Sequence, residues 1–94
     1  MSIFAIISPQ ESNDKLEAAI KALIPENNIF KVFSNQWLVC AGGTSQELSI
    51  KLGINKDDAD NTGPAIVVSV ASYWGRANPQ IWEWIGINWN KDCG

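Results

Sequence analysis

The chain has 94 residues, of which 46% are hydrophobic and 18% are charged, and its net charge is −3. This length allows one folded domain with one core, and the hydrophobic fraction excludes a disordered chain. The net negative charge and seven scattered basic residues argue against binding to duplex DNA, because lysine and arginine contacts to phosphate supply most of the affinity for nucleic acid.

The N-terminal quarter predicts a strand followed by a helix. Residues 3–7 are all apolar and precede a Ser-Pro pair, which is typical of a strand buried on both faces. Apolar residues then recur at helical spacing over residues 16–24, and Glu17 and Lys21 are expected to form an ion pair on the solvent side of that helix. The helix begins either at the Ser-Pro pair, as a capping box, or later at residues 12–13.

The middle of the chain predicts a hairpin and a second helix. Two strand-like runs, residues 29–33 and 36–41, are separated by Ser-Asn, which favours a β-hairpin. Thr44 and Glu47 then have the spacing of a capping box, so a helix is expected over residues 45–52.

The last third predicts a strand, a helix and an uncertain terminus. A polar, acidic loop over residues 55–64 precedes a strand-like run over residues 65–70. An Asn-Pro pair is typical of a helix start, so a helix is expected from Pro79 to about Ile85. Beyond Gly86, apolar residues alternate with asparagines, which leaves open a short terminal strand.

The order β-α-β-β-α-β, followed by a C-terminal appendage, is that of the ferredoxin-like fold. We therefore expect a single α+β domain over residues 1–94, with a ferredoxin-like core (residues 2–73) and a Trp-rich appendage, helix or strand (residues 74–94). The strands are apolar on both faces, although such a sheet packs its helices on one face only. The second face is expected to be covered by the C-terminal segment or by a second copy of the chain.

Four of the five tryptophans lie close together near the C-terminus, and they mark the candidate partner-binding segment. Trp82 and Trp84 are about 200° apart around a helix, so one face cannot bury both. Either the helix lies between two layers, or one ring contacts a partner, and exposed tryptophans are frequent interface anchors. The expected partner-binding residues are Trp74, Arg76, Trp82, Glu83, Trp84 and Trp89.

Arg76 suggests an alternative function for the chain. With Asn78 at a helix start and tryptophans nearby, it would bind an anion or a nucleotide, which would make the chain a small-ligand sensor. The simpler interpretation pairs Arg76 with the acidic loop or stacks it on a tryptophan. The loop residues Asp57, Asp58 and Asp60 lack the spacing of a calcium site and are expected to be solvated, or to face a basic partner.

Catalytic and metal-binding groups are scarce. The chain has no histidine, the commonest general base, and no serine or cysteine in a nucleophile elbow. Cys40 lies in an apolar run and is expected to be buried. With Cys93 it makes no structural zinc site, and the sequence allows but does not require a disulfide between the two.

These observations predict a binding protein rather than an enzyme. No apolar run is long enough to cross a membrane, so we expect a cytoplasmic protein. We expect a non-catalytic module without cofactor or metal, which binds another protein or a second copy of itself. A regulatory or inhibitory role, of the antitoxin or anti-defence type, fits the small size and the acidity by analogy.

Overall fold

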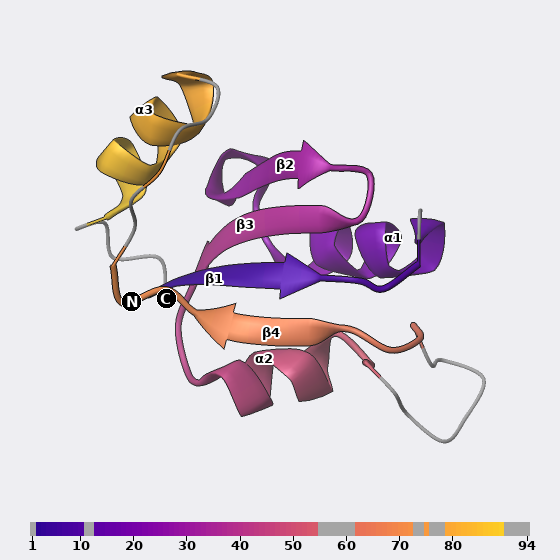
Figure 1. Cartoon of the computed structure of the whole chain (residues 1–94). Coiled ribbons are helices and arrows are strands. Elements are labelled where there is room, and N and C mark those ends of the chain that lie inside the picture. Colours follow the sequence, from indigo (N-terminus) through magenta and orange to yellow (C-terminus); the bar gives the residue numbers. More distant parts are fainter. Residues whose placement is uncertain (1, 11–12, 55–61, 73–74, 76–78, 90–94) are drawn as a thin grey trace.

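A computed structural model describes residues 2–10, 13–54, 62–72, 75 and 79–89 of the chain (Figure 1). The described residues form a small α+β domain with a four-stranded antiparallel sheet and three α-helices. In chain order the elements are β1 (Ser2–Ile7), α1 (Asp14–Leu23), a 3-10 turn (Glu26–Asn28), β2 (Ile29–Phe33), β3 (Gln36–Ala41), α2 (Ser45–Lys51), β4 (Ile66–Ser69) and α3 (Pro79–Asn88).

The strands lie in the order β2-β3-β1-β4, and each neighbouring pair is antiparallel. The β1–β3 register sets Ile6 opposite Trp37 and Phe4 opposite Val39, so these four side chains share one face. Helices α1 and α2 pack against that face, and Figure 1 shows α3 apart from them, near the beginning of β2. The core consists of Phe4, Ile6, Leu16, Ile20, Ile24, Trp37, Val39, Leu48 and Leu52.

Helix α1 uses the later of its two predicted starts. Asn13 is the N-cap, and its side-chain oxygen accepts a hydrogen bond of 3.0 Å from the Leu16 N–H. The capping box at Ser8 is wrong because the Ser8 backbone belongs to the end of the sheet. Its N–H donates to the Asn35 carbonyl (2.9 Å), and its carbonyl accepts from the Asn35 amide (3.0 Å).

Helix α2 begins as predicted. The Thr44 hydroxyl accepts from the Glu47 N–H at 3.1 Å, and the Glu47 carboxylate accepts from the Thr44 N–H at 3.1 Å. This reciprocal pair satisfies two backbone donors that would otherwise lack helical partners.

Replacing Thr44 by alanine is therefore expected to lower the free energy of unfolding by about 1 kcal/mol. Urea unfolding followed by circular dichroism would measure it. Thr44→Ser, which keeps the hydroxyl, should lose only a few tenths of a kcal/mol. Equal losses in the two variants would mean that the cap does not stabilise α2.

Helix α3 is longer than predicted, and the short strand suggested at Ile87 is wrong. The helix continues through Gly86 to Asn88 because Ile85 and Asn88, three residues apart, are both buried on one side. The Asn88 amide also donates to the Trp84 carbonyl at 2.8 Å, which supports the last turn. Among the described residues, no atom lies within 4 Å of the position where a Gly86 Cβ would be, so no close contact there requires a glycine.

The second sheet face, which is turned away from α1 and α2, contacts α3 at strands β2 and β3. The rings of Phe30 and Trp84 lie 6.1 Å apart at an interplanar angle of 53°, and Cys40 Sγ lies 3.8 Å from the Asn88 carbonyl oxygen. Cys40 is buried, as predicted, and is disulfide-bonded. Its sulfur therefore has no proton to donate, and the approach to Asn88 is a packing contact. Cys93, the other cysteine of the chain, lies outside the described residues.

Candidate functional site

Part of the second sheet face carries large apolar side chains in contact with water. Ile66 on β4 is 61% exposed and Val68 is 45% exposed. Ile66 pairs with Ile7 of β1, which is also exposed. We call Ile7, Ile66 and Val68 the open sheet face. Isolated exposed apolar residues are common, whereas these three lie side by side on the paired strands β1 and β4.

The predicted partner-binding residues on α3, and Trp89 directly after it, differ in exposure. Trp82, Trp84 and Trp89 are half-buried, whereas Glu83 is exposed. Trp82 and Trp84 lie on opposite flanks of a wide face centred on Ile85, which is why both are partly covered.

Several predicted site residues fall outside the described part of the chain. These are Trp74 and Arg76, together with Asn78, and the acidic loop residues Asp57, Asp58 and Asp60. The anion site suggested for Arg76 and the acidic contact surface therefore stay predictions.

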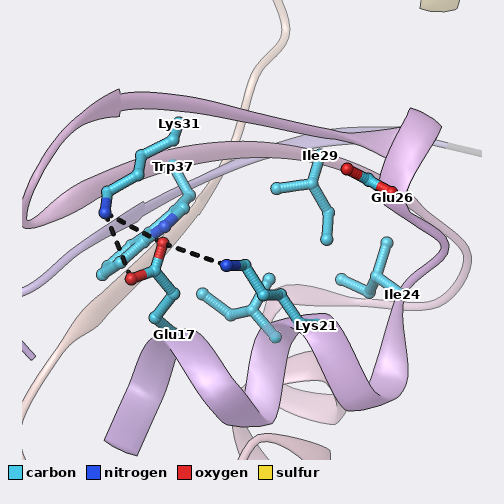
Figure 2. A pocket seen from close by; sticks show the side chains of 8 residues that line it. Glu17, Lys21, Ile24, Glu26, Ile29, Lys31 and Trp37 are labelled. Carbon is cyan, nitrogen blue, oxygen red and sulfur yellow. Dashed lines mark hydrogen bonds and ion pairs between the residues drawn. The ribbon is translucent and has the colours of Figure 1, made fainter. Parts of the chain in front are cut away.

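A cavity of about 470 Å³ lies between α1 and the β2–β3 hairpin, on the other side of the sheet (Figure 2). We call it the α1–β2 pocket. Figure 2 shows Glu17, Lys31 and Trp37 at one end of the pocket and Ile24 and Ile29 at the other, where Glu26 lies beside them. Its lining residues are Glu17, Ile20, Lys21, Ile24, Glu26, Ile29, Lys31 and Trp37.

The charged end of the α1–β2 pocket is organised by the Glu17 carboxylate. Lys31 Nζ lies 3.1 Å from Glu17 Oε1 and 2.9 Å from Oε2, whereas Lys21 Nζ lies 3.8 Å from Oε2. The hydrogen bond from Lys31 holds the pKa of Glu17 below its ordinary value of 4.5; partial burial opposes this shift, and the charges of Lys31 and Lys21 add to it.

The predicted Glu17–Lys21 ion pair is thus present but secondary. Glu17 is not on the solvent side, since its side chain is only 18% exposed, and its shortest contacts are with Lys31 from β2. The hairpin brings this lysine over the helix, and spacing along α1 alone does not reveal the contact.

Trp37 forms the inner wall of the same end and is 1% exposed. In Figure 2 its indole nitrogen is on the side of the ring that faces Glu17. The indole N–H makes only a minor contribution to the lowered pKa of Glu17, and no group in the described residues accepts a well-formed hydrogen bond from it. A buried donor without a good acceptor is costly.

The sequence did contain a signal for this pocket. Alternation along the second strand sets Lys31 on the same face as Ile29, and across the hairpin opposite Trp37. A lysine on the apolar face of a strand needs an anionic partner. The cluster contains no histidine, cysteine pair or glycine-rich loop, so no catalytic or metal-binding motif marks it in the sequence.

Stability should depend on pH through Glu17. Because the folded-state pKa is lowered, ionised Glu17 stabilises the fold above its unfolded-state pKa, near 4.5, and this contribution disappears as pH falls through the folded-state value. Urea unfolding between about pH 3 and about pH 7 should show the decrease, and Glu17→Gln should flatten it. Glu83→Gln, at an exposed position, should keep the wild-type profile; a Glu17→Gln profile identical to wild type would contradict the assignment.

Over the described ranges, no group of three histidine, cysteine, aspartate or glutamate residues could hold a metal ion. The same part of the chain has no helix that is long and apolar enough to cross a membrane. Comparison with known family models, curated proteins and solved structures finds no match to the chain.

Proposed function

We propose that this chain is a small non-catalytic binding module that contacts another protein, or a second copy of itself, through the open sheet face, with α3 as a second contact region at the β2–β3 side. The observation that carries the proposal is the set of exposed apolar side chains Ile7, Ile66 and Val68 on paired strands. Burying such side chains against a partner is favourable by about 25 cal/mol for each Å² of apolar surface removed from water.

The two edges of the sheet differ in a way that supports a contact at β4. Strand β2 directs Lys31 toward the helices, and its register is irregular between Lys31 and Phe33. Inward charges and irregular register both hinder the addition of a further strand. Strand β4 has the sequence Ile-Val-Val-Ser without a charged residue, and among the described strands it pairs only with β1. We therefore assign the partner to the β4 side.

We also propose a ferredoxin-like fold and a regulatory or inhibitory role for this chain. The element order and the strand order β2-β3-β1-β4 support a ferredoxin-like fold. The small size, the net charge of −3 and the absence of histidine support a regulatory or inhibitory protein, of the antitoxin or anti-defence type, rather than an enzyme.

The binding proposal can be tested with a photoreactive amino acid at Ile66, in protein expressed in its native cells. We expect a crosslink to one partner chain, a second copy or a different protein, and we expect Val68→Lys to abolish it while circular dichroism stays unchanged. Ala18→Lys, which adds the same charge at an exposed position of α1, is the matched control. Absence of a crosslink, together with a monomer in sedimentation, would contradict the proposal.

The Cys40 disulfide bears on the cellular location. Disulfides persist in oxidising compartments and are rare in the cytosol, so this bond weighs against the cytoplasmic location proposed from the sequence. Protein purified without reductant and then denatured should leave Cys40 unmodified by a maleimide, and prior reduction should make it reactive. Full modification without a reductant would show a free thiol and restore the cytoplasmic proposal.

A further inference from the structure

We propose that the α1–β2 pocket binds a carboxylate carried on a short aliphatic chain, with the carboxylate at Lys21 and Trp37 and the chain along Ile20, Ile24 and Ile29. This site is distinct from the open sheet face, since it lies on the helix-covered side of the sheet. The inference goes beyond the protein-binding function and does not depend on it.

The size and lining of the pocket suit a small amphiphile. A volume of about 470 Å³ is within the range of about 300–1,000 Å³ common for small-molecule sites. Ile20 and Ile24 come from α1 and Ile29 from β2, so the apolar part has walls from two elements. An aliphatic chain placed there would remove these side chains and itself from water.

The charged end favours one negative charge. Lys21 and Lys31 contribute two positive charges and Glu17 one negative charge, which leaves a net charge of +1. Lys31 is engaged by both oxygens of Glu17, but Lys21 is 69% exposed and only reaches the same carboxylate at 3.8 Å. Its ammonium can therefore turn to an incoming anion. The Glu17 charge disfavours a dianion such as phosphate by repulsion.

The indole N–H of Trp37 is a further feature of this end of the pocket that suits a carboxylate. The ring is 1% exposed, it lines the pocket, and its N–H has no well-placed acceptor in the described part of the chain. The Glu17 carboxylate beside this N–H accepts only a poor hydrogen bond from it, and the nitrogen is closed to water in this conformation, so a ligand carboxylate would reach it as Glu17 turns toward Lys31 and would supply a better acceptor. Figure 2 places Glu26 at the opposite end, where its charge repels an anion, so the ligand is oriented with its tail toward Glu26.

Proton–nitrogen NMR of the tryptophan indole groups tests the proposal directly, with the Trp37 signal identified by its loss in Trp37→Phe. Hexanoate should shift this signal saturably, with a dissociation constant on the order of 1 mM for so small a ligand. Hexanol, hexylammonium and acetate should bind at least about tenfold more weakly, because each lacks either the charge or the chain. Equal shifts with all four compounds, or no saturable shift with hexanoate, would overturn the proposal.

Two matched variants locate the carboxylate. Lys21→Gln should weaken hexanoate binding by about threefold to tenfold, a range that allows for the solvent exposure of this lysine. Lys51→Gln, an exposed lysine of α2 outside the pocket, should leave the binding unchanged. An unchanged affinity in Lys21→Gln, or an equal loss in both variants, would overturn the assignment of the charged end.

A carboxylate on an aliphatic group occurs both in free acids and at the C-terminus of a peptide that ends in leucine. Acetyl-Gly-Gly-Leu, compared with the same peptide amidated at its C-terminus, separates these sources. Tighter binding of the free-carboxylate peptide than of hexanoate would assign the site to a chain terminus, and the reverse would assign it to a small acid. Equal shifts with the acid and the amide would contradict a carboxylate site.

Discussion

Replacing Trp37 by alanine is expected to lower the free energy of unfolding by about 3–5 kcal/mol. Trp37 is the largest fully buried side chain among the described residues, and it lies in the centre of the sheet opposite Ile6 of β1 and Lys31 of β2. Removing the ring leaves a cavity that the two flanking strands cannot close. For a domain whose total stability is about 5–15 kcal/mol, much of the protein would unfold near physiological temperature.

Trp37→Phe is the control for this prediction. It keeps an aromatic ring and removes the indole N–H, so the loss should be clearly smaller than in Trp37→Ala. Urea unfolding of both variants would give the two values. A loss below about 1 kcal/mol in Trp37→Ala would mean that the core does not depend on this ring.

Asn13→Ala is expected to cost about 2–3 kcal/mol, an unusually large effect for a small polar residue. The buried Asn13 side chain makes two kinds of contact. Its oxygen caps α1 through the Leu16 N–H, and its amide donates to the Thr62 carbonyl at 2.8 Å. Alanine would remove the cap and leave the buried Thr62 carbonyl without this donor.

Asn13→Asp separates the two contacts because a carboxylate can still cap the helix but cannot donate to the Thr62 carbonyl. We expect it to lose about 1–2 kcal/mol, between wild type and Asn13→Ala, in urea unfolding at neutral pH. If the two variants lose the same amount, the cap contributes nothing measurable. If neither variant loses more than about 0.5 kcal/mol of unfolding free energy, the hydrogen bond to the Thr62 carbonyl contributes little to stability.

The two proposed surfaces can be disrupted independently. The open sheet face depends on Ile7, Ile66 and Val68, whereas the α1–β2 pocket depends on Lys21 and Trp37 on the opposite face. Val68→Lys should therefore leave hexanoate binding unchanged, and Lys21→Gln should leave the photocrosslink from Ile66 unchanged.

Local chemistry made most of the elements predictable. The hairpin over residues 29–41 and the Thr44 capping box depend on neighbours a few residues apart, so alternation and cap spacing were enough. Predictions from local sequence were wrong where contacts between distant residues determine the boundaries of a helix. Ser8 has the right neighbours for a helix start, but pairing with Asn35 takes it into the end of the sheet. Gly86 is expected to weaken a helix, but the burial of Ile85 and Asn88 stabilises α3 on both sides of this residue.

The sequence alone determined that this is a single small α+β chain with strands apolar on both faces and with few catalytic groups. Those properties depend on composition and on the spacing of apolar residues, which recur every two residues in strands and every 3.6 residues in helices. Only the tertiary structure decided which side chains meet. It set Lys31 and Trp37 of the hairpin against Glu17 of α1, and it left Ile66 and Val68 exposed beside β1. Both proposed sites arise from contacts between residues far apart in the chain, which depend on strand order and helix packing rather than on local pattern.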